Sequence, residues 1–264
     1  MKTLGFIGMG NMGKAMLKGC LNVFSPDQLV FTDVFEQNCR NIKEKTGVDY
    51  VMDAEGCAGM VKYLVLAIKP QVYPQVLEQL SGKIQPDQIV ISIAPSYSIA
   101  RVKEGLGEQV RVVRAMPNTP AMVGEGMSGV CFSDDAYTEE ERQNIHSFFS
   151  SFGKMEEVPE HLINAVTVAS GSSPAFVYMF IEALADSAVK YGMPRDKAYK
   201  FAAQAVLGSA KMVLETGEHP GKLKDNVCSP GGTTIEGVAV LEAKGMRSAV
   251  IEAASAVFDK CNQM

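Results

Sequence analysis

The chain is poor in the residues that hold metal ions. It has three histidines, all far apart, and none of its six cysteines belongs to a Cys-x-x-Cys pair. Protein zinc sites need such side chains at short, regular spacing. We therefore expect no metal site, and we expect the cysteines to be unpaired thiols of a protein from a reducing compartment.

Basic residues are outnumbered and do not cluster. The chain has 25 Lys and Arg against 30 Asp and Glu, which gives a formal net charge of −5. A chain of that sign has no general attraction for nucleic acids or for anionic membranes. We expect neither kind of partner, and we expect a cytoplasmic protein.

We also expect no secretory signal, although one long apolar run is present. The opening MKTLGFIG contains too short an apolar stretch for a signal peptide. Residues 162–181 carry no charge over a length that would span a bilayer. Their centre is rich in Ser, Thr and Gly and contains a proline, which is costly in lipid. We expect a helix that is buried in a soluble core or in a subunit interface.

Strand and helix patterns alternate through the first 160 residues. Strands are predicted at residues 3–8, 28–33, 62–68, 88–94 and 110–116, with weaker candidates at 126–133 and 153–160. Helices are predicted at residues 11–23, 36–45, 71–80, 96–105 and 138–149. The strands are almost continuously apolar, as is typical of a parallel sheet buried on both faces. We predict a doubly wound α/β domain over residues 1–160.

Only helical patterns follow residue 160. Helices are predicted at residues 162–191, 195–216, 221–226, 233–244 and 246–261. This change predicts a second, all-α domain over residues 161–264. Helices with so much apolar surface are expected to bury part of it against another subunit.

A glycine motif opens the α/β domain. Gly8, Gly10 and Gly13 stand in G-x-G-x-x-G spacing after a predicted strand and at the start of a predicted helix. In a Rossmann dinucleotide-binding domain the first glycine permits a tight turn, the second lets the backbone approach a pyrophosphate, and the third lets helix and strand pack closely. The free N–H groups of the helix then face the phosphates. A tight turn without a ligand is the alternative.

An acidic residue ends the second predicted strand. Asp33 lies twenty residues after Gly13, where a carboxylate binds the ribose hydroxyls of NAD and repels the 2′-phosphate of NADP. This favours NADH. Arg40 in the following helix is a candidate cation for a 2′-phosphate, and Asp33 would alternatively cap that helix.

Two loops follow the carboxyl ends of later strands, where open α/β sheets bind ligands. Pro70 is expected to hold Lys69 extended. Pro117 and Pro120 stiffen a loop that would present Asn118 to a nicotinamide ring, although an ordinary connection is equally consistent with the pattern. The predicted coenzyme contacts are Gly8, Gly10, Asn11, Met12, Gly13, Asp33, Lys69, Pro70, Met116, Pro117 and Asn118.

A second flexible, hydroxyl-rich stretch, S-P-G-G-T-T at residues 229–234, precedes a predicted helix. Its glycines permit close backbone approach, and the free N–H groups of the helix suit an anion. Thr233 with Glu236 also fits a capping box, and the two interpretations are compatible.

Several stretches together resemble one family, the Δ1-pyrroline-5-carboxylate reductases. They are GFIGMGNMG, AIKPQ, RAMPNTP, ASGSSPAFVY and, most specifically, DNVCSPGGTTIEGVAVLEAKGMRSAVIEA. The resemblance covers the whole chain. One departure is Ser173, where the family commonly has glycine.

The resemblance implies an enzyme that reduces 1-pyrroline-5-carboxylate to L-proline, the last step of proline synthesis, with NADPH or NADH. It implies a Rossmann domain followed by a helical dimerisation domain, in dimers that often form decamers. It implies that Thr234 contacts the ring nitrogen of the substrate. The substrate carboxylate would bind Ser229 and the backbone of Gly232 and Thr233. Family members often prefer NADPH, which conflicts with the interpretation of Asp33.

Two other functions are open to a chain with this Rossmann start. A β-hydroxyacid dehydrogenase or imine reductase is one, but the hydroxyacid enzymes usually need a lysine acid/base where this chain has its Ser-Pro-Gly-Gly loop. A coenzyme-sensing protein without turnover is the other.

Overall fold

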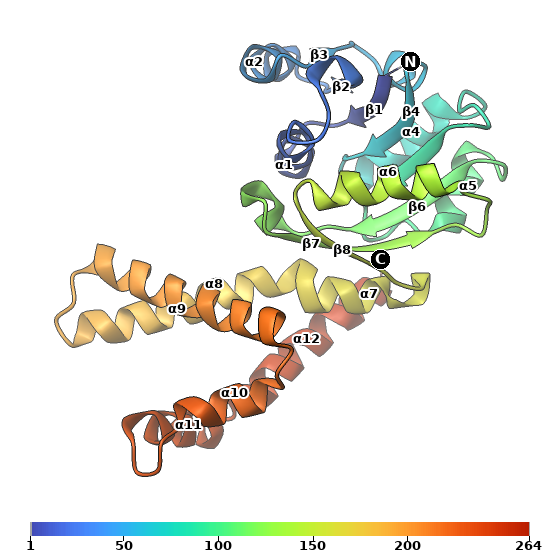
Figure 1. Cartoon of the computed structure of the whole chain (residues 1–264). Coiled ribbons are helices and arrows are strands. Elements are labelled where there is room, and N and C mark those ends of the chain that lie inside the picture. The colour runs from blue at the N-terminus through green and yellow to red at the C-terminus, as the bar shows by residue number, and fades with distance from the viewer. Residues whose placement is uncertain (1, 264) are drawn as a thin grey trace. The chain divides into compact units, whose positions relative to one another are not determined.

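The structure, a computed structural model, describes residues 2–263 and divides into two compact units. One unit comprises residues 2–172 and 257–263, and the other comprises residues 173–256. Figure 1 shows that the first unit contains the sheet and that the second is helical. The predicted domains, residues 1–160 and 161–264, stay a prediction.

The first unit is built on one eight-stranded sheet with the order β3-β2-β1-β4-β5-β6-β7-β8. The strands are β1 (Lys2–Ile7), β2 (Leu29–Thr32), β3 (Asp49–Tyr50), β4 (Val61–Leu66), β5 (Ile89–Ser92), β6 (Arg111–Met116), β7 (Gly126–Phe132) and β8 (Gly153–Glu157). The strand order reverses beside β1, between the β2 side and the β4 side. In open α/β sheets ligands bind at this reversal, next to the carboxyl ends of the strands.

Helices cover both faces of the sheet. They are α1 (Asn11–Cys20), α2 (Glu36–Thr46), α3 (Ala54–Ala58), α4 (Tyr73–Leu80), α5 (Ile99–Leu106), α6 (Glu139–Ser150) and α7 (Ile163–Val166). Successive residues of a strand point to opposite faces, so Phe6 packs in one core with α1, α2 and α6, and Ile7 packs in the other with α3, α4 and α5. Burial on both faces, predicted from the apolar strands, is confirmed.

Two strands, β7 and β8, run against the expected parallel direction. β7 is antiparallel to β6, whereas every other pair of neighbours is parallel. The connection between them, residues 117–125, holds only the short 3₁₀ helix η3 (Thr119–Val123). A parallel crossover needs a dozen or more residues, so the chain turns back instead.

The helix predicted over residues 162–191 is not one continuous α-helix. The 3₁₀ helix η4 (Glu160–Leu162) and α7 precede a π-helical segment, η5 (Thr167–Ser172), before α8 (Ser173–Lys190) begins. Hydropathy periodicity does not distinguish i→i+5 from i→i+4 hydrogen bonding over one turn, so the sequence carried no signal for this change. π-helical turns often occur at functional sites.

The second unit is helical throughout. It contains α8, α9 (Arg195–Thr216), α10 (Pro220–Val227), α11 (Thr233–Ala243) and the start of α12 (Met246–Asn262), whose last turns belong to the first unit. α8 and α9 pack as a hairpin around Ala185, Ala198 and Ala202 (Figure 1). Large apolar side chains remain exposed on all these helices, as Phe180, Leu214, Val227, Leu241 and Ile251 illustrate. The unit therefore exposes much apolar surface in a single chain.

The continuous helical stretch Glu160–Lys190 is long and apolar enough to cross a membrane by length and composition alone. Interface and core helices of soluble proteins pass the same test. Only 6% of its most apolar window is buried within the chain. The expectation that this helix is buried in the core of the chain is therefore wrong. Burial in a subunit interface, the other alternative, remains a proposal.

A buried carboxylate holds the amino-terminal edge of the sheet. Glu141, 3% exposed, accepts hydrogen bonds from Arg111 Nη1 at 2.8 Å and from the backbone of Thr138 at 2.9 Å, and it pairs with Lys62 Nζ at 3.0 Å. Burial alone would raise the pKa of Glu141, but the hydrogen bonds from Arg111, Thr138 and Lys62 outweigh it and lower the pKa to about 2. Because ligands bind at the opposite edge of such sheets, we assign this cluster to stability.

We predict that Glu141→Gln lowers the free energy of unfolding at neutral pH by roughly 3 kcal/mol, because a buried ion pair loses one partner. The lowered pKa means that the stabilisation is present above the ordinary value of 4.5 and is lost as the pH falls toward about 2. Urea unfolding at one fixed protein concentration measures both effects. Glu140→Gln, on the exposed side of the same helix, is the control, and equal urea midpoints for the two variants would contradict the prediction.

Candidate active site

The three motif glycines lie between β1 and α1 in the geometry that their predicted roles require. Gly8 has φ +97°, and a Cβ on it would lie 2.6 Å from the carbonyl oxygen of Ala67. A Cβ on Gly13 would overlap the carbonyl oxygen of Gly8, whereas a Cβ on Gly10 would meet nothing within 4 Å. The backbone at Gly10 is therefore open to close approach by a ligand.

The amino terminus of α1 is available for an anion. Gly10 is the N-cap residue, and within residues 2–263 no side chain caps the helix there. The first N–H groups of a helix have no partner inside it, so those of Asn11, Met12 and Gly13 face outward with the positive end of the helix dipole. These residues fit the pyrophosphate of a dinucleotide.

Met9, the residue between the first two motif glycines, is held from three sides. Its side chain is 1% exposed in the sheet core. Its N–H donates to Asp33 Oδ2 at 2.7 Å, and its carbonyl oxygen accepts from Asn38 Nδ2 at 3.2 Å. The glycine loop is thus fixed by side chains that follow β2.

Asp33 does not cap α2, so that alternative is wrong. The N-cap residue of α2 is Phe35, because the chain makes one further turn before the helix begins at Glu36. Asp33 Oδ1 accepts from Phe35 N at 3.0 Å, so each carboxylate oxygen already accepts one backbone hydrogen bond. Arg40, the candidate cation, pairs with Glu36 at 2.6 Å on the helix surface.

The loop after β4 lies beside the glycine loop. Gly8 contacts Ala67 closely, and Lys69 follows two residues later. Lys69 is exposed and extended, with ψ 148°, and Pro70 begins the 3₁₀ helix η2 (Pro70–Val72). The extended conformation expected before proline is confirmed.

The loop after β6 differs from its expected role. Asn118 is buried rather than presented, because its Oδ1 accepts from Met127 N at 2.9 Å and its Nδ2 donates to the carbonyl of Ser170 at 3.0 Å. The side chain of Met116 lies against Gly171 in the π-helical segment. The following helix, η3, packs against α1. The structure thus gathers three predicted coenzyme loops at the carboxyl ends of β1, β4 and β6.

The Ser-Pro-Gly-Gly loop of the helical unit forms a second open helix terminus. Gly231 has φ +66°, and Gly232 N donates to the carbonyl of Ser229 at 3.0 Å. A Cβ on Gly232 would overlap Ser229 Oγ, so the serine hydroxyl lies directly over the Gly232 α-carbon. Thr233 and Thr234 are both exposed.

The capping box expected from Thr233 and Glu236 is wrong. α11 begins at Thr233 itself, so its N-cap residue is Gly232, and no described side chain caps the helix. A threonine inside the first turn cannot take the N-cap role. The loop therefore leaves a serine hydroxyl, a threonine hydroxyl and unpaired N–H groups together, which is a donor set suited to a carboxylate.

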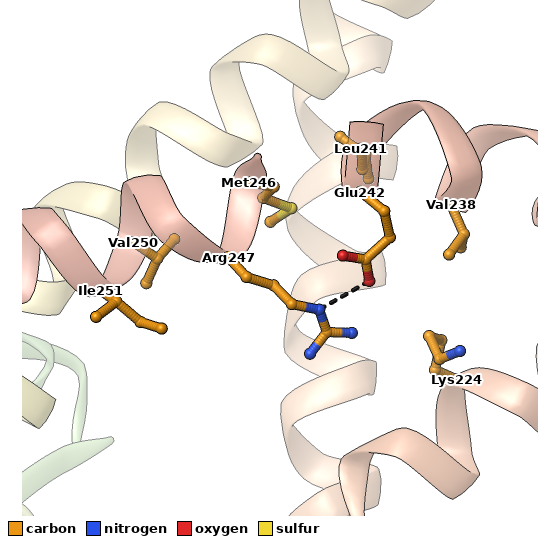
Figure 2. A pocket seen from close by; sticks show the side chains of 8 residues that line it. All are labelled: Lys224, Val238, Leu241, Glu242, Met246, Arg247, Val250 and Ile251. Atoms are coloured by element: carbon orange, nitrogen blue, oxygen red, sulfur yellow. Dashed lines mark hydrogen bonds and ion pairs between the residues drawn. The ribbon is translucent and has the colours of Figure 1, made fainter. Parts of the chain in front are cut away.

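A separate apolar groove of about 540 Å³ lies among α10, α11 and α12. Figure 2 shows the eight residues that line it: Lys224, Val238, Leu241, Glu242, Met246, Arg247, Val250 and Ile251. Its charged rim includes a hydrogen bond of 2.7 Å from Arg247 Nε to Glu242. None of the predicted substrate contacts lines it, so we assign it to the apolar surface of this unit.

Sequence reasoning missed Asn38 and the π-helical segment. Asn38 reaches the glycine loop only because α2 packs beside it, and an asparagine in a polar helix carries no signal of that contact. The anchoring of Ser170 by Asn118 depends in the same way on packing between distant segments.

Sequence comparisons match both parts of the chain to known families. Residues 160–264 match the profile described as pyrroline-5-carboxylate reductase dimerisation, and residues 3–96 match NADP oxidoreductase coenzyme F420-dependent. The pyrroline-5-carboxylate reductase of Escherichia coli K12 is 45% identical, over 100% of this chain and 98% of the relative. That of Methanosarcina acetivorans is 42% identical, over 96% of this chain and 94% of the relative. The dimerisation profile supports a homo-oligomer.

Solved structures agree with the sequence matches. A pyrroline-5-carboxylate reductase from Coxiella burnetii has a TM-score of 0.90 and 31% identity, covering 99% of this chain and 98% of that one. The Plasmodium falciparum pyrroline carboxylate reductase, solved with NADP bound, has a TM-score of 0.88 and 31% identity, covering 98% and 97%. The predicted fold, a Rossmann domain followed by a mostly helical one, is confirmed, and the chain belongs to the pyrroline-5-carboxylate reductase family of NAD(P)-dependent oxidoreductases.

Proposed function

We propose that this chain reduces 1-pyrroline-5-carboxylate to L-proline with a hydride from NADPH or NADH. The observation that carries the proposal is full-length similarity to pyrroline-5-carboxylate reductases, 45% identical in one case. The uncapped, glycine-initiated helix termini of α1 and α11 support it, because one suits a pyrophosphate and the other a carboxylate.

The chemistry needs orientation more than acid catalysis. The substrate is a cyclic imine that bears a carboxylate, and the carbon of a protonated imine is already a good hydride acceptor. The reduced nicotinamide supplies the hydride. The work of the protein is then to place the substrate and to stabilise its charges.

The substrate roles follow from the loop before α11. The N–H group of Thr233, with the Ser229 hydroxyl, would hold the carboxylate, whereas the N–H group of Gly232 already donates to the Ser229 carbonyl. The Thr234 hydroxyl would contact the ring nitrogen, which gains a lone pair as the hydride adds to the neighbouring carbon. A contact to that nitrogen therefore strengthens as the transition state forms.

The coenzyme roles belong to the three loops of the sheet unit. Gly8, Gly10, Asn11, Met12 and Gly13 would bind the pyrophosphate. The loops at residues 69–70 and 116–118 would flank the nicotinamide half, with Asn118 contributing only its backbone because its side chain is committed elsewhere.

We further propose a cytoplasmic enzyme that has no nucleic-acid or membrane partner. Its assembly would be a dimer or a decamer, in which the exposed apolar side chains of the helical unit are covered by other copies. Light scattering separates the two masses.

The function is tested by following the absorbance of reduced nicotinamide when 1-pyrroline-5-carboxylate is added to the protein with NADH or NADPH. Oxidation of the coenzyme with formation of proline is the expected result. Coenzyme binding without oxidation would instead support a sensing protein. Turnover of β-hydroxyacids alone would support the dehydrogenase alternative.

Thr234→Ala is expected to lower kcat about tenfold, the value of one lost hydrogen bond in the transition state. Stability should barely change, because the side chain is exposed. Thr234→Ser keeps the hydroxyl and should stay near the parent rate. Steady-state kinetics and thermal melts measure both, and a parent-like kcat for Thr234→Ala would remove this residue from the mechanism.

Gly232→Ala is expected to raise the KM for 1-pyrroline-5-carboxylate roughly tenfold, because the new methyl group displaces the Ser229 hydroxyl from the carboxylate site. The matched control is Gly237→Ala in the same helix. A Cβ on Gly237 would meet nothing within 4 Å, so that variant should keep its KM. If both variants shift KM alike, the predicted carboxylate site is wrong.

A further inference from the structure

We propose that Asp33 and Asn38 form a clamp on Met9 that holds the glycine loop in its binding conformation, and that Asp33 acts as a positioning residue for NADH and NADPH alike. The clamp consists of the hydrogen bonds to the Met9 backbone at 2.7 Å and 3.2 Å. The inference rests on the proposed function only in that the loop binds a nicotinamide dinucleotide.

Three contacts fix Met9 before any ligand arrives. Its side chain lies in the core, 1% exposed, and both polar groups of its backbone are bound by side chains from outside the loop. The bond to Asp33 joins an N–H to a carboxylate, and such bonds are stronger than those between neutral groups. The preceding residue is fixed as well, because Gly8 N donates to the carbonyl of Thr32 at 2.9 Å.

Asp33 is itself held in place. Its second carboxylate oxygen accepts from Phe35 N, and its carbonyl oxygen accepts from the thiol of Cys39, which is fully buried. The carboxylate orientation is therefore set by the protein rather than by a ribose. The next two side chains, Val34 and Phe35, are apolar and exposed, at 88% and 71%.

A clamp and a coenzyme selector predict different patterns of binding. The loop faces the pyrophosphate, which NADH and NADPH share, whereas the 2′-phosphate belongs to NADPH alone. A loop that is ordered before binding loses little conformational entropy when the ligand binds. If the backbone of one residue must be ordered on binding, the Kd rises roughly tenfold. That factor should be the same for both coenzymes.

The test is calorimetric titration of the full-length protein with NADH and with NADPH. Asp33→Ala is expected to raise both Kd values about tenfold. Asn38→Ala, which changes no charge, is expected to raise both by a smaller common factor. In the double variant, the factor by which each Kd rises should be smaller than the product of the two single-variant factors, because both side chains act on Met9. Gln37→Ala is the matched control, since within residues 2–263 this neighbouring side-chain amide bonds only Asn41 on the helix surface, and it should leave both Kd values unchanged.

Kinetics add a readout that general loss of structure would not give. The KM for either coenzyme should rise in Asp33→Ala and Asn38→Ala while kcat and the melting temperature stay close to those of the parent.

Two results would overturn the proposal. In the first, Asp33→Ala changes the Kd values for NADPH and NADH by different factors, and their ratio changes by more than about tenfold. That result would make Asp33 the coenzyme selector predicted from the sequence. In the second, the Kd values stay unchanged in Asn38→Ala. Because calorimetry needs no turnover, a protein that binds both coenzymes but fails to reduce 1-pyrroline-5-carboxylate would refute the proposed function and leave the clamp testable.

Discussion

The proposed chemistry depends on helix amino termini whose N–H groups no side chain satisfies. α1 and α11 both begin after a glycine, Gly10 and Gly232, and no described side chain caps either helix. By contrast, Ser98 and Thr138 cap α5 and α6 with their own hydroxyls. An unsatisfied helix terminus is costly without a partner and is well suited to an anion. The same device is thus available twice, once for a pyrophosphate and once for a carboxylate.

Leaving those groups open requires that the surrounding backbone be held by other contacts. In the sheet unit, Met9 is fixed through its buried side chain and through Asp33 and Asn38, while Asn118 ties the loop after β6 to the π-helical segment. In the helical unit, the positive φ of Gly231 and the hydrogen bond from Gly232 to Ser229 shape the loop. That unit has a small internal core and much exposed apolar surface, and it matches a dimerisation domain.

Local patterns predicted the features that depend on neighbours in the chain. The glycine spacing, the apolar strands and the order of strands and helices identified the Rossmann domain, because turns and burial periodicity are encoded within a few residues of each other. Where the outcome depended on packing, the predictions failed. The short connection after β6 reversed β7, the helix after residue 160 took a π-helical turn, and Asn118 turned inward to bond Met127 and Ser170.

Sequence by itself therefore determined the fold class, the family and the two helix termini that suit anions. Tertiary structure alone decided what the polar side chains near those termini contact. The sequence predicts that Asp33 is a ribose ligand or a helix cap. In the folded chain its carboxylate oxygens instead accept hydrogen bonds from the backbone N–H groups of Met9 and Phe35. Nothing local distinguishes these outcomes, because Met9 and Asp33 are brought together by the parallel pairing of β1 with β2. A carboxylate bonds whichever donors the fold places within reach, and one of these donors, Met9, lies 24 residues away in the sequence.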